Sequence, residues 1–394
     1  MNQSTPAVGQ VSQAAGDTAR REAHLPALTV QNHAANLIAL SNGDLLCAWF
    51  GGTQEGIPDI SIYLSRLAAG SDTWSAPVRL SEDASRSEQN PVLFEAPDGK
   101  LWLIYTAQLS GHQNTSIVRR RVSGDLGRTW GPIETLFDTP GTFVRQPIVV
   151  AADGAWLCPV FMCRVAEGER WSGNDDISVV MRSTDGGQHW NAHEVPASVG
   201  CVHMNIQPLK DGGFLALYRS RWADHIYSSR STDGISWSAP QPLDLPNNNS
   251  SIQFVALANG HLGLVFNHSS AANSTERRAS LYDDIEDSED SGSLVTQSAS
   301  QRGTAFWGAP RAPMTLAISQ DGGRSWPLMR NLEVGDGYCM TNNSAEKRNR
   351  EYSYPSIVQS ADGRLHIAYT YFRQNIKYVT VEEAWVAQAV AAAA

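Results

Sequence analysis

The stretch RSTDGGQHW occupies residues 182–190 and combines a polar turn, two adjacent glycines and a closing tryptophan. The pattern returns in RVSGDLGRTW, RSTDGISW and AISQDGGRSW, which end at Trp130, Trp237 and Trp326. In such a turn the aspartate accepts hydrogen bonds from backbone N–H groups, glycine tolerates positive φ, and tryptophan fills space towards the next layer. Catalysis would need the element once, so four copies indicate an architectural role.

A second repeat consists of an Asn-Gly or Asp-Gly pair followed by a strand-like run. It occurs six times, mostly at intervals of about 55 residues, beginning at Asn42, Asp98, Asp153, Asp211, Asn259 and Asp362. Such pairs between apolar runs are strong hairpin signals. We call the recurring turn of residues 182–190 and its copies the Asp-box turn. The repeating unit is therefore strand, Asp-Gly turn, strand, loop, strand, Asp-box turn, strand. Six such units closing in a ring predict an all-β fold, a six-bladed β-propeller with Asp-box turns.

The ends of the chain and one insertion interrupt this regular pattern. The expected parts are a disordered N-terminal tail at 1–23, the propeller at 24–385 with an insertion at about 270–310, and a flexible C-terminal tail at 386–394. The last unit ends after its third strand, so Leu25–Val30 is predicted to supply the missing outer strand. The insertion is rich in serine and carries the acidic run YDDIEDSED, which predicts a solvated, mobile loop beside the site.

Composition narrows the class of partner. A formal net charge of −10 argues against a nucleic-acid or anionic-membrane partner, because both require basic surfaces.

The five cysteines have no zinc-type spacing and are expected to be buried free thiols. Neither a secretory leader nor a membrane-spanning run is apparent, so a soluble cytoplasmic protein is expected. We expect neither a metal nor an organic cofactor.

The candidate site lies on the rim opposite the two kinds of turn. There the starts of the first strands and the loops after the second strands converge on the axis. The side chains at these positions are polar and differ from unit to unit, unlike the repeated turns. Arginine forks bind carboxylates and amides read hydroxyl groups, so the predicted partner is an acidic glycan. The predicted substrate-binding residues are Asn90, Arg145, Gln146, His203, Asn205, Gln207, Arg219, Arg221 and Asn249.

From about His33 to Val381 the chain resembles the sialidase (neuraminidase) superfamily with Asp-box repeats, in a branch found in bacteria and plants. The resemblance rests on the Asp-box turns and on the segments HAANLIALSNGDLLCAWFGGTQEG, NPVLF, RSR, RAPMTLAISQDGGRSW and EYSYPSIVQSADGRLHIAYTYFRQNIKYV. It implies a six-bladed propeller with a tyrosine nucleophile, an assisting glutamate, an aspartate acid/base and an arginine cluster around the substrate carboxylate.

Carried onto this sequence, the resemblance makes Tyr354 the nucleophile, Glu351 its assistant and Asp59 the acid/base. Arg145 and Arg219, or Arg221 in place of Arg219, would belong to the arginine cluster. The sequence departs from the family pattern at its start, because NHAAN replaces the motif that supplies the first arginine. His33 stands near that position and becomes a further catalytic candidate.

The sequence therefore predicts a carbohydrate-active enzyme, an exo-acting sialidase-like glycoside hydrolase on carboxylated glycans. One alternative is a lyase or rhamnosidase on uronate-containing glycans; in the lyase, His33 or Tyr354 would remove the proton. A third possibility is a glycan-binding propeller without catalysis. Tyr352 rivals Tyr354 on spacing alone, because Glu351 and Tyr354 face the same side of an extended strand only if a bulge intervenes.

Overall fold

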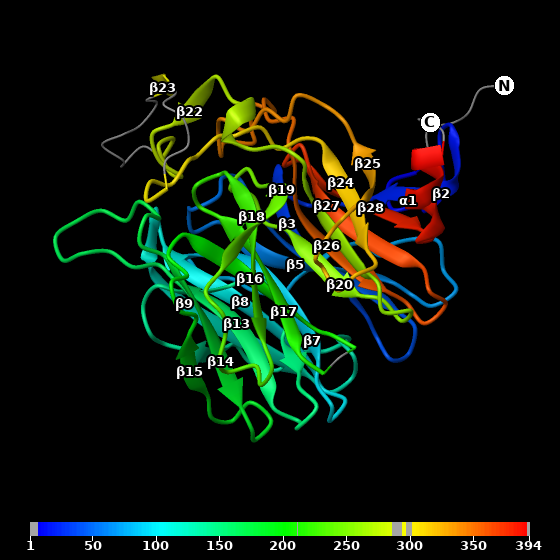
Figure 1. Cartoon of the computed structure of the whole chain (residues 1–394), viewed down its shortest axis with the longest axis horizontal. Helices are drawn as coiled ribbons and strands as arrows, with labels where there is room; N and C mark the ends of the chain where they lie inside the picture. Colours follow the sequence, from blue (N-terminus) through cyan, green and yellow to red (C-terminus); the bar gives the residue numbers. More distant parts are fainter. Residues whose placement is uncertain (1–6, 211, 286–293, 297–301, 392–394) are drawn as a thin grey trace.

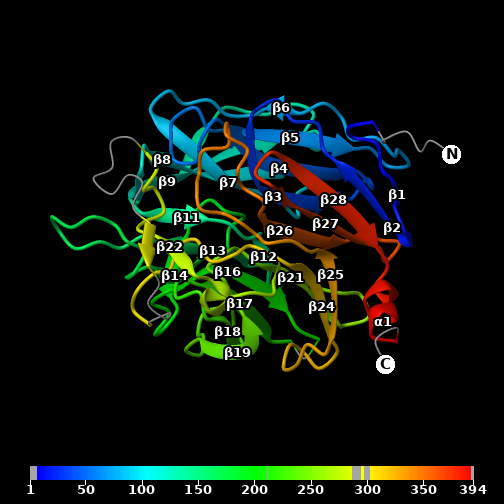
Figure 2. The same cartoon turned by 90° about the horizontal axis from the view of Figure 1, so that it is seen from above.

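The computed structural model describes residues 7–210, 212–285, 294–296 and 302–391. Six antiparallel sheets are arranged around a central axis, and each contributes one blade (Figure 1). Viewed from above, the successive blades follow one another around the ring (Figure 2). The predicted all-β, six-bladed β-propeller is therefore confirmed.

The first three blades follow directly in sequence. Blade 1 contains β3 (Gln31–Ala39), β4 (Leu45–Gly52), β5 (Ser61–Leu67) and β6 (Val78–Arg79). Blade 2 contains β7 (Arg86–Glu95), β8 (Leu101–Leu109), β9 (His112–Ser123) and β10 (Glu134–Phe137). Blade 3 contains β11 (Thr142–Val144), β12 (Val149–Val150), β13 (Trp156–Met162), β14 (Ile177–Ser183) and β15 (Asn191–Glu194). Its innermost strand is split into β11 and β12, which both pair with β13.

The other three blades include the insertion and the closure of the ring. Blade 4 contains β16 (Cys201–Pro208), β17 (Phe214–Ser220), β18 (His225–Ser231) and β19 (Gln241–Pro246). Blade 5 contains β20 (Gln253–Ala256), β21 (Leu262–Asn267), β24 (Met314–Ser319) and β25 (Leu328–Glu333). Blade 6 contains β26 (Tyr352–Gln359), β27 (Leu365–Tyr371), β28 (Asn375–Val381), β2 (Asp17–His24) and β1 (Ser12–Ala14).

The recurring turn has the predicted place and the predicted bonds. Its four copies connect the third and fourth strands of blades 2 to 5. In blade 3 the Asp185 carboxylate accepts hydrogen bonds from the backbone N–H groups of Gln188 and His189, both at 3.0 Å. Trp190 packs edge-on against Phe137 of the preceding blade. The turn therefore connects the third and fourth strands of its own blade, and its tryptophan packs at the interface with the preceding blade.

The ring closes through the N-terminal segment, but not through the residues predicted for it. β2 pairs antiparallel with β28, and β1 forms a hairpin with β2. The assignment of a disordered tail to residues 1–23 is therefore wrong for residues 12–23, while residues 1–6 lie outside the described part of the chain. Residues 25–30, predicted to form the outer strand, connect β2 to β3 without strand structure.

The charged side chains of β2 explain why the sequence did not predict this strand. Its sequence, DTARREAH, lacks the apolar alternation that marks a half-buried strand. Instead, Arg20 forms an ion pair with Glu333 at 2.9 Å, and Glu22 forms one with Lys377 at 3.2 Å. Lys377 also contacts Glu333 at 2.7 Å. These ion pairs therefore add to the backbone pairing of β2 with β28 and connect β2 to blade 5.

The C-terminal segment forms a helix rather than a flexible tail. The only helix of eight or more residues among the described segments, α1 (Ala384–Ala391), starts just after blade 6, and residues 392–394 lie beyond the description. Trp385 and Val386 are buried in the core, and the Trp385 indole donates to the Asp17 carboxylate at 2.7 Å. Figures 1 and 2 both place α1 beside β2, at the edge where the two termini lie. Among the described segments, no helix has the length and apolar character to cross a membrane.

The insertion between β21 and β24 lies on the predicted site rim. Its described parts include a short 3₁₀ turn, η1 (Ala271–Asn273), and the hairpin β22 (Glu276–Arg278) and β23 (Leu294–Thr296), at the upper left of Figure 1. The start of the acidic run is buried rather than solvated, because Asp283 pairs with Arg278 and Tyr282 is enclosed. Residues 286–290 of that run lie outside the described segments, so the predicted mobility is untested there.

A repeated distortion of the first strands shapes the site rim. Five blades have a non-glycine residue with φ between 50° and 63° at the same place, namely Ala34, Asn90, His203, Asn249 and Tyr354. In four of them the register of the first strand shifts at this point. Left-handed φ at such residues is strained, and strain of this kind concentrates at functional sites. In β26 the register shifts between Ser353 and Ser356, so Tyr354 lies within the irregular part of the strand.

Candidate functional site

Tyr354 lies at the centre of a buried polar cluster on the axis. Its hydroxyl oxygen accepts a hydrogen bond from Nη1 of Arg219 at 2.6 Å. The guanidinium carbons of Arg145, Arg219 and Arg311 lie 5.4, 5.6 and 5.5 Å from the centre of its ring. The His33 ring is 4.3 Å away, centre to centre. Only 7% of Tyr354 is exposed, so these interactions act in a medium that screens charge weakly.

Glu351 is fully buried and is held by arginines rather than by the tyrosine hydroxyl. Arg311 Nη1 donates to one carboxylate oxygen at 2.6 Å, and Arg373 Nε donates to the other. Burial opposes ionisation of Glu351, but these two guanidinium groups lower its pKa to about 2. Glu351 is therefore charged at neutral pH, and its described contacts differ from the tyrosine contact expected from the sequence.

The expected acid/base residue, Asp59, lies outside the cluster. Its side chain is exposed and accepts a hydrogen bond from the backbone N–H of Thr53 at 3.0 Å, so it stabilises a turn. Four residues earlier in the same loop, Glu55 is buried and accepts a hydrogen bond from Arg373 Nη1 at 2.6 Å. The structure therefore brings Glu55, rather than Asp59, into the buried cluster.

Two histidines in the cluster are held in their neutral form. Burial and the surrounding arginines lower the pKa of both His33 and His203 well below the ordinary value of 6.5. His33 Nδ1 bonds the Thr370 hydroxyl at 2.8 Å, and its Nε2 has no hydrogen-bond partner within the described structure. The contact of His203 Nε2 with Arg219 is long, at 3.4 Å, and because a guanidinium only donates, Nδ1 carries the proton.

Arg145 organises the backbone around Tyr354. Its Nη2 donates to the carbonyl oxygens of Ala35, Tyr354 and Pro355 at 3.0 to 3.2 Å, and its Nε donates to Ser251. These contacts join the first strands of blades 1, 5 and 6 at their bulges. Burial lowers the pKa of Arg145 to about 10. Its main contacts are structural, while its Nη1 has no partner among the described groups.

Three of the predicted binding residues form hydrogen bonds between blades. Asn205 Oδ1 accepts from Phe254 N at 2.7 Å, and Gln207 Oε1 accepts from Ala256 N at 3.2 Å, so both join blade 4 to the neighbouring blade 5. Gln146 Nε2, in blade 3, donates to the Ile252 carbonyl of blade 5 at 2.7 Å. These amides connect the first strands of different blades, so the expectation that they bind substrate finds no support in their contacts.

Asn249, Asn90 and Arg221 belong to the edge of the cluster. Asn249 Oδ1 accepts from Arg219 Nε at 2.7 Å and so orients that guanidinium. Asn90 is buried, and its Oδ1 lacks a partner within the described residues. Arg221 donates twice to the buried carboxylate of Asp176, at 2.9 and 2.6 Å. Arg221 is thereby neutralised, which leaves Arg219 as the better candidate for contact with an anion.

The cluster carries an excess of positive charge. Its buried arginines are Arg145, Arg219, Arg221, Arg311 and Arg373, and its buried carboxylates are Glu55, Asp176 and Glu351. Among the described residues, no carboxylate forms an ion pair with Arg145 or Arg219. Burial lowers the pKa of Arg219 to about 10, although Tyr354 partly opposes this effect. Buried charges of this kind call for a compensating anion.

The chain also matches the sequence model of a known protein family. Residues 43–367 match the model of the BNR repeat-like domain, which is most of the chain. The chain belongs to the BNR repeat-like domain family. None of the curated protein sequences searched matches it significantly.

Solved structures with a similar fold include sialidases. A Hadza microbial sialidase aligns with a TM-score of 0.66 and 14% identity, over 91% of this chain and 67% of that chain. The NanB sialidase from Streptococcus pneumoniae aligns with a TM-score of 0.64 and 12% identity, over 91% and 69%. A protein of unknown function from Dyadobacter fermentans aligns with a TM-score of 0.64 and 14% identity, over 92% and 99%. At such identities the likeness shows that this BNR repeat-like protein has the sialidase fold.

Sequence reasoning missed four residues of the cluster in this BNR repeat-like protein. They are Glu55, Asp176, Arg311 and Arg373. All four lie in the loops after the second strands, on the rim that the repeat pattern had singled out. Their position in the repeat was therefore a usable signal. Their pairing was not, because each charge finds its partner in a distant segment.

Within the described residues, no group of three or more histidine, cysteine, aspartate or glutamate side chains is arranged to hold a metal ion. All five cysteines are buried and unpaired, as expected from the sequence.

Proposed function

We propose that the protein is an exo-acting glycoside hydrolase that removes a terminal carboxylated sugar from an acidic glycan, with Tyr354 as nucleophile. The contact of Arg219 with the Tyr354 hydroxyl at 2.6 Å carries this proposal. A guanidinium N–H stabilises a phenolate more than a neutral phenol, because the developing charge strengthens the hydrogen bond. Attack by this oxygen on the anomeric carbon would form a covalent glycosyl-tyrosine, which water then hydrolyses.

The surplus of buried cations supports a carboxylated sugar as the substrate. The guanidinium groups of Arg219 and Arg311 adjoin Tyr354, and a carboxylate placed between them would supply the missing negative charge. A tyrosine nucleophile suits such a substrate, because a carboxylate nucleophile would be repelled by the anionic sugar. The unpartnered Asn90 Oδ1 would accept a hydrogen bond from a sugar hydroxyl group.

Substrate binding would also prepare a base. In the free protein the arginines disfavour a charged His33. A bound carboxylate offsets part of that repulsion and raises the His33 pKa towards its ordinary range, so His33 can accept the Tyr354 proton in the complex. Glu351 keeps Arg311 and Arg373 in place. Proton donation to the leaving oxygen stays with Asp59, the predicted acid/base, because the Glu55 carboxylate is held in an ion pair with Arg373 at 2.6 Å.

A screen of chromogenic glycosides tests this function. Carboxylated sugars should be hydrolysed and their neutral counterparts should not, while Tyr354→Phe should abolish turnover. Rapid quenching and mass spectrometry should detect a glycosyl adduct on the peptide that contains Tyr354. Hydrolysis without dependence on Tyr354 would refute the proposed nucleophile.

A second candidate, β-elimination on a uronate, is favoured by one observation. The Tyr354 hydroxyl is bonded to an arginine and adjoins neutral histidines, without a described carboxylate contact. Such a tyrosine or histidine can remove a proton next to a carboxylate that arginines neutralise. An unsaturated product that absorbs in the ultraviolet would identify this reaction, whereas a hydrolase releases a saturated sugar. Binding without either product would identify a glycan-binding propeller.

A further inference from the structure

A cavity of about 600 Å³ lies on the site rim, between the loops of blades 2 and 3 and the insertion of blade 5. This volume is in the range of ordinary ligand sites. Its wall combines aromatic rings with polar groups, including Trp171, Trp307, Tyr282, Asn174, Ser280 and Arg277. Aromatic faces together with hydroxyl and amide groups suit a sugar, which has apolar ring faces and polar edges.

The aromatic part of this wall is fixed before any ligand arrives. The Trp171 indole donates to Asp176 Oδ1 at 2.9 Å, and Arg221 holds the other oxygen of that carboxylate. The Arg221 guanidinium carbon in turn lies 5.4 Å from the centre of the Trp171 ring and 5.1 Å from that of Trp307. The two indoles are 5.9 Å apart, centre to centre. Prior ordering of side chains reduces the entropy that binding must overcome.

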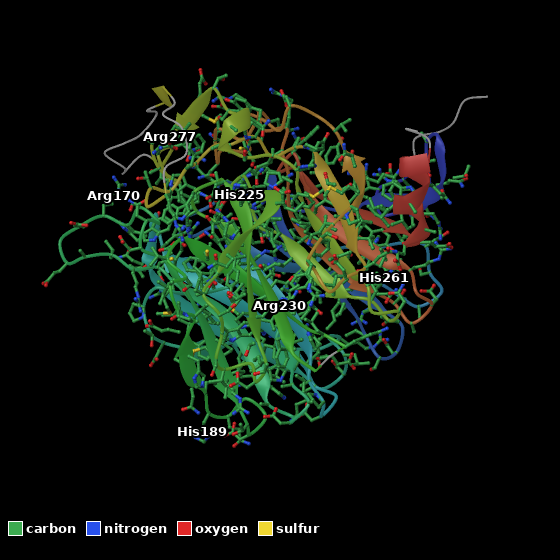
Figure 3. All side chains as sticks on the ribbon, in the orientation of Figure 1. Arg170, His189, His225, Arg230, His261 and Arg277 are labelled. Atoms are coloured by element: carbon green, nitrogen blue, oxygen red, sulfur yellow. The ribbon has the colours of Figure 1, made fainter. Side chains whose placement is uncertain are left out.

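Arg277 places a positive charge in the same wall. Its guanidinium carbon lies 5.3 Å from the centre of the Phe306 ring. Within the described part of the chain, no carboxylate forms an ion pair with Arg277, and its buried Nε lacks a hydrogen-bond partner. Figure 3 shows Arg277 and Arg170, which also lines the cavity, on the side of the molecule that carries the insertion. An unpartnered guanidinium beside aromatic rings favours a ligand that is both a sugar and an anion.

The cavity adjoins the Tyr354 cluster without being part of it. Trp307 lines the cavity and also lies 6.0 Å from the Arg219 guanidinium carbon, which itself contacts Tyr354. On the other side, the Tyr282 hydroxyl accepts hydrogen bonds from the amides of Gln108 and Gln113, at 3.0 and 3.1 Å. Trp307 therefore lies between the cluster and the cavity, and Tyr282 is held in the cavity wall by the two amides.

We propose that this cavity is a second sugar-binding site, which takes a carboxylated sugar of the same acidic oligosaccharide whose terminal residue enters the Tyr354 cluster. The inference rests on the proposed function for its substrate class. It adds that the preferred substrate carries at least two acidic sugars, with the inner one packed against the aromatic wall of Trp171 and Trp307 and its carboxylate on Arg277.

Titration calorimetry on the full chain with Tyr354→Phe, which leaves oligosaccharides uncleaved, tests this site. The probes are trimers of galacturonic acid and of α-2,8-linked sialic acid, with maltotriose as the neutral comparison. We expect at least one acidic trimer to bind ten times more tightly than maltotriose, and adding Arg277→Gln to remove that advantage. The matched control is Arg128→Gln, which removes an exposed charge at a recurring turn on the opposite rim.

The site is refuted if neither acidic trimer binds more tightly than maltotriose, or if Arg277→Gln leaves the preference unchanged. Failure of the proposed hydrolase function gives a different result. In that case the wild-type protein hydrolyses no acidic glycoside, while the Arg277-dependent preference for acidic trimers persists.

Discussion

Arg219 Nη1 and the Tyr354 hydroxyl lie 2.6 Å apart, although the two residues are separated by 135 positions in the sequence. The contact joins blade 4 to blade 6 across the axis of the propeller. It places a buried cation, without a carboxylate partner among the described residues, on the oxygen that would become a phenolate.

Tyr354→Phe should leave the fold intact and lower kcat by about three orders of magnitude or more, because the nucleophilic oxygen is lost while the ring remains. Circular dichroism and steady-state kinetics on a confirmed substrate measure both effects. Tyr352→Phe is the matched control: its hydroxyl donates to the Val334 carbonyl at 3.2 Å, away from the cluster. A Tyr354→Phe enzyme with normal turnover would exclude the tyrosine mechanism.

Arg219→Lys should reduce kcat/KM by a factor of about 100, since the lysine ammonium cannot reproduce the fork that contacts both Tyr354 and Asn249. Steady-state kinetics on a confirmed substrate measures this loss. Arg230→Lys, at an exposed contact with the Gly322 carbonyl, is the control. Equal effects of the two variants would argue against a role for the Arg219 contact.

The stability of the fold should depend on pH through the ionisation of Glu351. Burial opposes its ionisation, but Arg311 and Arg373 bring its pKa down from 4.5 to about 2. Because the folded-state pKa is depressed, a stabilisation of roughly 3 kcal/mol is complete above pH 4.5 and is lost as the pH falls towards 2.

We therefore expect Glu351→Gln to be destabilised by several kcal/mol at neutral pH, because two buried guanidinium groups lose their partner. The difference in the free energy of unfolding between this variant and the wild type should shrink below about pH 4, as measured by urea denaturation. The control Glu82→Gln removes an exposed partner of Arg79 and should change little at any pH. A deficit that stays constant with pH would contradict the assignment.

Glu333→Gln should loosen the closure of the ring. Glu333 contacts Arg20, Lys377 and the Tyr369 hydroxyl, so its loss leaves Glu22 as the remaining carboxylate partner of the two cations. We expect a loss of about 2–4 kcal/mol in the free energy of unfolding. Hydrogen exchange should quicken first in β2. Glu134→Gln, which breaks the exposed pair with Arg120, should cost less than about 1 kcal/mol.

Asp185→Ala should destabilise the fold by about 1–3 kcal/mol, because the backbone N–H groups of Gln188 and His189 lose their acceptor. Specific activity of the folded fraction should not change, since the turn lies on the rim opposite Tyr354. His189→Ala, at a more exposed position of the same turn, is the milder control. Lost activity at an unchanged melting temperature would connect the turn to the site.

The sequence by itself determined the propeller, the number of blades, the position of both kinds of turn and the rim that carries the site. These features follow from short-range patterns, because an aspartate in the recurring turn bonds N–H groups three and four residues away. Six repeats of such local signals define the ring without knowledge of any distant contact.

Only the tertiary structure determined which charged side chains form ion pairs with one another. Arg373 reaches Glu55 across 318 positions of sequence, and it shares Glu351 with Arg311, so the glutamate expected to assist Tyr354 is bound elsewhere. The same holds for β2, whose charged residues pair with blades formed near the other end of the chain. Local sequence does not encode these partners, because charge pairs are selected by the geometry of the closed ring and by the cost of leaving a buried charge alone.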